Sequence, residues 1–356
     1  MSNPVQRYRP RVERLEERAV PTFYSNQIVA DGSGNFTATI LTNQATLTVS
    51  YDGVADTLTL QDPNSSPLVI AGVTGNVNLT LFSSASANFL ADLRFQGTFA
   101  GNYNVTVNQA RAAFDADVDF DTPSGAATIL GNVRITTNAA GDSDITPITS
   151  SPVQIVGNLS IHTNAGGPTA RKSLNFGNNW TVRGSLWVPS ITNFGMAAGN
   201  TVDGSTTIRT RAARALAQSV TITAGTSLHS LTLNLGDVSG TGTSSAALGG
   251  LVETFTTITM GANTGGPATN SLTLTGFVSL GSFIAITGKN GSKDVNIANV
   301  AGPLARLTVV LGNATDNHVD FLGANQFLFT TLVGGLGVNK VSGVIPSPNR
   351  VIRFTF

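Results

Sequence analysis

Two copies of one eleven-residue segment lie 26 residues apart near the middle of this chain, beginning at Gly131 and Gly157. The first reads GNVRITTNAAG and the second GNLSIHTNAGG, so seven of the eleven positions are identical. A fixed period of this size is typical of repeat architectures, in which each unit buries its apolar side only by stacking on its neighbours. The repeat therefore restricts the chain to a stacked fold that grows in one dimension.

The same period extends over five rows, and each row alternates apolar and polar residues. The rows begin at Gly75, Gly101, Gly131, Gly157 and Gly184. One apolar column contains Val77, Tyr103, Val133, Leu159 and Leu186, and the next contains Leu79, Val105, Ile135, Ile161 and Val188. Because side chains of a strand alternate between its two sides, we expect both columns to point inward. In particular, Ile135 should lie directly beside Ile161 in the core.

A second strand follows in several of the units, so we expect each coil to consist of two strands and two turns. Examples are 92–95, 116–120 and 173–176. Connections between parallel strands are almost always right-handed. The sequence therefore predicts an all-β fold, a right-handed parallel β-helix (solenoid) of roughly ten coils with an N-terminal β-hairpin cap. Asn138 and Asn164 are expected to form a hydrogen-bonded ladder at a turn, in the left-handed conformation that Asn tolerates.

Three segments are expected along the chain. Residues 1–21 form a charged tail, expected to be disordered, and residues 71–356 form the solenoid with a C-terminal closing strand. Residues 22–70 form an entry cap, in which 46–51 and 57–61 alternate like strands and are joined by a Gly-containing loop. A hairpin here would cover the unpaired backbone that a solenoid exposes at its end.

Composition narrows the class of protein further. The 356 residues include 38 Gly, 41% are hydrophobic and 11% are charged, which favours a folded, β-rich chain over a disordered or helical one. The formal net charge is zero, so we expect no nucleic-acid partner. Cysteine is absent, which excludes disulfides and thiolate metal sites. No apolar window reaches the roughly 18 residues of a membrane span, and the oligomeric state stays open.

The start of the chain carries a resemblance to a known group of proteins. Residues 9–21 read RPRVERLEERAVP. This segment resembles the short N-terminal motif of exported planctomycete proteins, in which a basic stretch leads to Leu-Glu-x-Arg and a Pro. Together with the coils, it suggests a planctomycete-type exported β-helix repeat protein. The resemblance covers fewer than twenty residues and implies an extracellular or cell-surface location.

One strand carries a dense row of carboxylates. Asp115, Asp117, Asp119 and Asp121 alternate with apolar residues, which places all four on one outward side, with neighbours about 7 Å apart. Such oxygen ligands suit calcium, and we expect weak binding at most. The alternative is a solvated surface that Arg94, one coil earlier, partly neutralises. No other cofactor is expected.

A second candidate surface combines an outward Trp with basic side chains. The aligned rows place Arg134 and Trp187 in one outward column and His162 in the next. An indole ring beside such groups can stack on a sugar ring, whereas more often an outward Trp only covers a neighbouring loop. The other two histidines, His229 and His318, lie far away in the sequence, so a histidine metal site is not expected.

These features favour a non-catalytic secreted or cell-surface β-solenoid with a structural, adhesive or matrix role, whose partner is an extracellular polysaccharide or another surface component. The alternative is a polysaccharide lyase or hydrolase of the pectin-lyase-like β-helix class that acts on acidic glycans. Lysine is scarce, and no coil carries a long insertion that would form the wall of a groove. We therefore expect no catalytic residues and lean against an enzyme.

Overall fold

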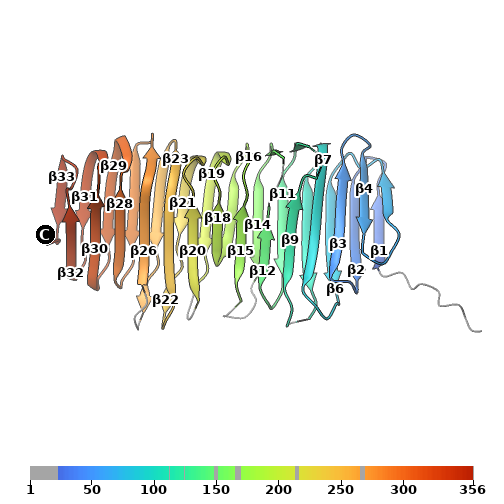
Figure 1. Cartoon of the computed structure of the whole chain (residues 1–356), viewed down its shortest axis with the longest axis horizontal. Coiled ribbons are helices and arrows are strands. Elements are labelled where there is room, and N and C mark those ends of the chain that lie inside the picture. Colours follow the sequence, from blue (N-terminus) through green and yellow to red (C-terminus); the bar gives the residue numbers. More distant parts are fainter. Residues whose placement is uncertain are drawn as a thin grey trace, which may run out of the picture.

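The computed structural model describes residues 23–111, 113–123, 125–147, 151–164, 170–212, 216–264 and 269–355. The charged tail with the exported-protein motif lies outside these residues. The described chain is all-β without a helix, and its parallel strands stack as a solenoid of about ten turns. Figure 1 shows the strands side by side across a long body, with the N-terminal strands at one end and the C-terminal strands at the other. The expected parallel solenoid is confirmed.

Three parallel sheets run along the solenoid. Sheet 1 is formed by β3 (Thr46–Asp52), β7 (Phe89–Phe99), β9 (Ala116–Asp121), β12 (Ser143–Thr146), β15 (Lys172–Phe176), β18 (Asn193–Met196), β20 (Ala217–Ile222), β23 (Thr243–Val252), β26 (Thr269–Ser279), β28 (Lys293–Ala298), β30 (Ala314–Leu322) and β32 (Gly337–Gly343). Sheet 2 is formed by β2 (Phe36–Thr42), β6 (Val77–Ser83), β8 (Tyr103–Gln109), β11 (Val133–Asn138), β14 (Leu159–Asn164), β17 (Leu186–Ile191), β19 (Thr201–Thr210), β21 (Ser227–Asn234), β24 (Phe255–Met260), β27 (Phe283–Gly288), β29 (Ala301–Leu311), β31 (Gln326–Val333) and β33 (Asn349–Ile352).

Sheet 3 is built from short strand segments and was not expected from the sequence. It begins at the end of β7 and continues through β10 (Ala127–Ile129), β13 (Val153–Ile155) and β16 (Trp180–Val182). Further along, the ends of the longer strands continue it, because β19, β21, β23, β26, β29 and β31 each bend from one sheet into another. The central coils therefore contain three strands rather than the expected two.

The register within sheet 2 is the expected one. Ile135 pairs with Ile161, and Val133 pairs with both Tyr103 and Leu159. These side chains are at most 2% exposed. Both predicted apolar columns thus form the inner side of the sheet, and the alternation of the sequence determines which residues enter the core.

Aromatic rings fill one part of the core. Phe95 stacks on Phe120, with ring centroids 4.6 Å apart, and Phe120 contacts the edge of Trp180 at 4.9 Å. Trp180 is 3% exposed. One of the two tryptophans is therefore structural, and only Trp187 is available to a ligand.

The row glycines are required by close contact between backbones rather than by an unusual φ angle. A Cβ added at Gly157 would lie 2.5 Å from the carbonyl oxygen of Gly131, and one at Gly131 would lie 2.3 Å from that of Gly101. The Asn that follows each of these glycines forms a ladder, in which the Asn158 amide donates to Asn132 at 3.1 Å. The Gly-Asn pairs therefore form a corner where successive coils touch.

Asn138 and Asn164 also form the expected ladder, since Asn164 Nδ2 donates to Asn138 Oδ1 at 2.6 Å. The prediction that they adopt the left-handed conformation is wrong. The described non-glycine residues with positive φ are Asp56, Asn179, Asn299 and Arg353. Asn138 and Asn164 instead end β11 and β14 in extended conformation. The amide side chain is used for stacking between coils and not for a turn.

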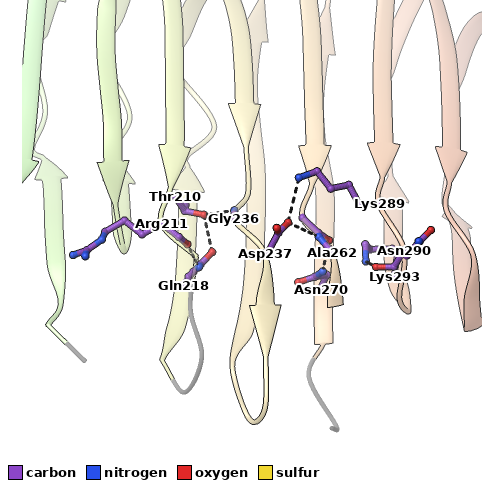
Figure 2. A network of polar contacts seen from close by, with 11 residues as sticks. Thr210, Arg211, Gln218, Gly236, Asp237, Ala262, Asn270, Lys289, Asn290 and Lys293 are labelled. Carbon is purple, nitrogen blue, oxygen red and sulfur yellow. Dashed lines mark hydrogen bonds and ion pairs between the residues drawn. The ribbon is translucent and has the colours of Figure 1, made fainter. Parts of the chain in front are cut away.

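A column of polar side chains lies inside the solenoid, at the start of the sheet 1 strands. Its members are Ser143, Lys172, Thr192, Gln218, Ser244, Asn270, Lys293, Asn317 and Asn339, each at most 3% exposed. Figure 2 shows Gln218, Asn270 and Lys293 on different coils at one level of the fold. We call these residues the interior polar column.

The interior polar column satisfies carbonyl groups of the loops that enter sheet 1. Lys172 Nζ donates to the carbonyls of Ala139 at 3.2 Å and Gly141 at 2.6 Å. Lys293 Nζ donates to Gly291 O at 2.9 Å, and Asn270 Nδ2 donates to Gly261 O at 2.8 Å. Buried carbonyls without donors would be costly, so these polar residues stabilise the corner.

The expected entry hairpin is present. β3 pairs antiparallel with β4 (Thr57–Gln61), and β4 pairs antiparallel with β5 (Leu68–Ala71). A further strand, β1 (Phe23–Ala30), pairs antiparallel with β2. Because β2 and β3 also pair in parallel with β6 and β7, parallel stacking begins within the segment expected to form the cap.

Candidate functional site

Sheet 1 carries the predicted row of carboxylates. Asp117, Asp119 and Asp121 alternate on β9 with three buried residues, and all three are partly exposed on the outward side. Asp115 immediately precedes the strand and is also partly exposed. The prediction that these carboxylates share one outward side is confirmed for Asp117, Asp119 and Asp121. The sequence did not show that the next coil adds Asp142 and Asp144 beside them.

Hydrogen bonds connect these two coils through their backbone. Asp115 Oδ1 accepts from the Asp142 amide at 2.7 Å, and Asp117 Oδ1 accepts from the Asp144 amide at 3.0 Å. Asp115 Oδ2 also accepts from the Asn88 side chain at 2.8 Å. The carboxylates thus bridge the coils and keep further oxygen atoms available to solvent.

The pKa of Asp117 is raised to about 6, mainly by burial and also by the nearby charges of Asp144, Asp115 and Asp119, while the hydrogen bond from the Asp144 amide acts in the opposite direction. Burial also raises the pKa of Asp119, followed by the charges of Asp92 and Asp121. The row therefore contains carboxylates that repel one another and that no cation fully compensates.

The main contact of Arg94 is not with the four carboxylates of the row. Its guanidinium binds Asp92 of the same strand, with Nη2 2.7 Å from Oδ2. Arg94 pairs in register with Asp121, so it lies at the margin of the row. Among the residues that the structure describes, no group of three or more His, Cys, Asp or Glu is arranged to hold one metal ion.

A shallow pocket of about 350 Å³ lies further along the same sheet. Gly195 of β18 leaves a gap in an outward column between Asn175 and Thr221. Asn193 and Ser219 complete the polar lining, and the Ser219 hydroxyl donates to Asn193 Oδ1 at 3.1 Å. The pocket contains amides and hydroxyls without a charged group, so it offers hydrogen bonds but no acid or base for catalysis.

Sheet 2 carries the predicted aromatic surface. Trp187 is 44% exposed, and its ring meets that of His162 edge to face, with centroids 4.9 Å apart. Trp187 pairs in register with Ser160, which pairs with Arg134. Arg134 and Trp187 are therefore two coils apart, about 10 Å. The structure joins Trp187 and His162 directly and leaves Arg134 at a distance that a two-sugar ligand spans.

His162 is held in position by its neighbours. Its Nε2 lies 2.7 Å from the Ser160 hydroxyl. Burial lowers its pKa, and the charge of Arg134 lowers it further, so the imidazole is neutral at pH 7. A neutral, oriented imidazole can exchange hydrogen bonds with a sugar hydroxyl while it supports the Trp187 ring.

The other histidines lie on separate coils, as expected. His229 Nδ1 lies 3.2 Å from Glu253, and His318 Nδ1 lies 3.7 Å from Asp320. Each is therefore paired locally with one acid. Within the described ranges, the three histidines do not form a common site.

The sequence did not reveal how charge is divided between the sheets. The outward side of sheet 1, here called the aspartate face, carries Asp92, Asp117, Asp119, Asp121, Asp144, Asp294, Asp316 and Asp320. The outward side of sheet 2, here called the arginine face, carries Arg134, Arg209, Arg306 and Arg350. The net charge of the chain is zero, so composition gives no sign of this division. The two sets of residues become distinct only when each strand is assigned to its sheet.

The described part of the chain contains no helix long and apolar enough to cross a membrane. No protein-family model, curated protein or solved structure matches this sequence.

Proposed function

We propose that this protein is a non-catalytic, exported β-solenoid, located outside the cell or at its surface, with a structural, adhesive or matrix role. In this proposal its partner is an extracellular polysaccharide or another surface component. The observation that carries the proposal is the exposed Trp187, supported edge to face by His162 on the outer side of a parallel sheet. A sheet surface with one aromatic platform suits contact with an extended chain.

The resemblance of residues 9–21 to an export motif supports the location. The absence of cysteine is compatible with export because stacking alone holds the core together. Neither feature depends on the identity of the ligand.

Retention on insoluble polysaccharides tests the adhesive role. We expect the protein to bind at least one polysaccharide, and we expect Trp187→Ala to weaken binding about tenfold, as loss of one stacking contact implies. Phe255→Ala is the matched control, since Phe255 is an exposed aromatic residue of the same sheet, at 36% exposure, on a different coil. Equal loss in both variants, or no binding by the parent protein, would contradict the role assigned to Trp187.

A second candidate function is cleavage of acidic glycans. The observation that favours it is the row of carboxylates beside Arg94, in which Asp117 has a raised pKa of about 6, within the range of a general acid. A depolymerisation screen on acidic polysaccharides, with and without calcium, distinguishes the two functions. Product formation that Asp117→Asn abolishes would establish the enzyme, whereas unchanged chain length supports the non-catalytic role.

A further inference from the structure

Two of the three sheets carry opposite charges on their outer sides. From β7 onward the aspartate face carries eight carboxylates, two of which form ion pairs within the face, Asp92 with Arg94 and Asp316 with Lys340. The strand segments paired in sheet 2 contain no Asp or Glu, so no acidic residue lies beside the four arginines of the arginine face within these paired segments. We propose that the aspartate face of one molecule docks on the arginine face of a second copy, so that solenoids associate side by side.

The arginines are available for such a contact. Arg134, Arg209, Arg306 and Arg350 are all exposed, and none forms an ion pair with a described residue. By contrast, Arg183 binds Asp203 at 2.6 Å and Lys289 binds Asp237 at 3.3 Å, both away from the two faces. Arg183 and Lys289 thus have acidic partners within the molecule, whereas the arginines of the arginine face, like the exposed Arg171 and Arg353 elsewhere, form no ion pair with a described residue.

The aspartate face would gain from an external cation. Asp117 lies beside Asp144 in register, and Asp119 lies beside Asp92, so like charges occupy neighbouring strands. Like charges directly opposite each other destabilise a sheet. A guanidinium group placed over such a pair can donate hydrogen bonds to both carboxylates, and its positive charge relieves the repulsion between them.

The two faces also match in the spacing of their outward side chains. Both are parallel sheets of one solenoid, so their outward side chains repeat at the same strand spacing of about 4.8 Å. Two solenoids with parallel axes can therefore lay rows of side chains against rows over many coils, at the face-to-face distance of about 10 Å that packed sheets adopt. The repeat makes one favourable contact recur along the interface.

The contact joins two different faces and is therefore heterologous. The docked pair still presents one free face of each charge, an arginine face on one molecule and an aspartate face on the other, so association continues until a ring closes or an array forms. This inference concerns a second copy of the chain and does not depend on polysaccharide binding. It would give the proposed matrix role a physical basis.

Sedimentation velocity across a concentration series tests the contact. At low salt we expect particles larger than one chain, and we expect the apparent association constant to fall about tenfold or more between 50 and 500 mM salt, because salt screens exposed charges. We expect Arg134→Glu/Arg209→Glu/Arg306→Glu to remain monomeric. Arg183→Glu is the matched control, because it reverses an exposed arginine off the arginine face, and it should associate as the parent protein does.

A charge exchange gives the sharpest result. Asp119→Lys/Asp121→Lys/Asp144→Lys/Asp294→Lys/Asp316→Lys should also be monomeric alone, since only three of the eight carboxylates then remain on its aspartate face and both of its faces are basic. Mixed with the arginine variant, it should assemble, because an acidic sheet 2 then meets a basic sheet 1. Melting curves confirm that both variants are folded, and the single substitutions Arg306→Glu and Asp144→Lys serve if a multiple variant unfolds.

Three results would overturn the proposal. The first is a parent protein that stays monomeric at high concentration and low salt. The second is an arginine variant that associates as strongly as the parent protein, and the third is a mixture of the two variants that fails to assemble. If the monomer instead binds an acidic polysaccharide or an oligonucleotide through the same arginines, the occupant of the arginine face is an external polyanion and not a second copy.

Discussion

Ile161 illustrates how strongly one inward position constrains a coil. It is 1% exposed and pairs with Ile135 on the preceding coil. Ile161→Asp would bury a carboxylate without a partner, so we expect a loss of about 3 kcal/mol or more in the free energy of unfolding. Chemical denaturation measures this. Thr207→Asp, on the outward side of sheet 2, is the control and should change stability by only about 0.5 kcal/mol.

Lys172 makes a prediction about pH. Its pKa is lowered from an ordinary value of 10.5 to about 8, mainly by burial and also by the charge of Arg211. Between pH 8 and 10 the unfolded chain therefore binds more protons than the native state, and the stability contributed by this group rises with pH. Lys293, with a pKa of about 8, acts in the same direction.

Replacement by Gln tests this effect while it retains a donor for the carbonyls of Ala139 and Gly141. The free energy of unfolding of Lys172→Gln/Lys293→Gln should rise less steeply between pH 8 and 10 than that of the parent protein. Lys289→Gln is the control, since Lys289 is exposed. Parallel curves for all three proteins would show that the buried lysines do not titrate in this range.

At the scale of elements, the sequence predicts the long strands well and the short ones poorly. The columns through Ile135 and Ile161 follow from strict alternation over six or more residues, which fixes which side is buried. β10, β13 and β16 have three residues each, too few for alternation to distinguish them from turns. The third sheet was missed for that reason.

The interior polar column was missed for a related reason. Polar residues such as Lys172 and Asn270 at the start of a strand normally point outward, and only the position of the loop carbonyls shows that they point inward. The candidate sites show the same limit. The row of Asp115 to Asp121 is visible along one strand, whereas Asp144 joins it only because β12 lies next to β9.

The row on β9 makes a second prediction about pH. The native pKa of Asp117, about 6, lies above its ordinary value of 3.8, so the native state retains a proton that the unfolded chain releases. The stability contributed by this group therefore rises as pH falls from about 6 to about 4. Asp117→Asn should remove that rise in urea denaturation, and an unaltered pH profile would contradict the raised pKa.

Calcium should act on the same row. Outward carboxylates on neighbouring strands can share a cation weakly, in the roughly millimolar range of extracellular modules. At pH 7 we expect several millimolar calcium to raise the melting temperature of the parent protein by a few degrees through mass action. Asp117→Asn/Asp119→Asn should abolish the response, and magnesium at equal ionic strength controls for screening. A response equal in parent and double variant would exclude this site.

For the whole molecule, we predict that the first twenty residues are not needed for folding. All described strands begin at or after Phe23, and in the part of the chain whose burial is described, from residue 31 onward, the first buried hydrophobic residue is Phe36. Removal of residues 1–20 should therefore leave the circular dichroism spectrum and the melting midpoint unchanged. Loss of the β signal would show that the segment stabilises the end of the solenoid.

The stacked glycines have a consequence for the size of the molecule. Gly131 and Gly157 contact each other through backbone alone, and the 26-residue unit that begins at Gly131 supplies one complete turn with its own Gly-Asn corner. A tandem duplication of this unit would supply the Gly-Asn corner on which the next coil stacks, and it would lengthen the solenoid by about 4.8 Å. Duplication or loss of such units in a gene can therefore change the length of the solenoid in steps of one coil. The cross-section of the solenoid stays the same.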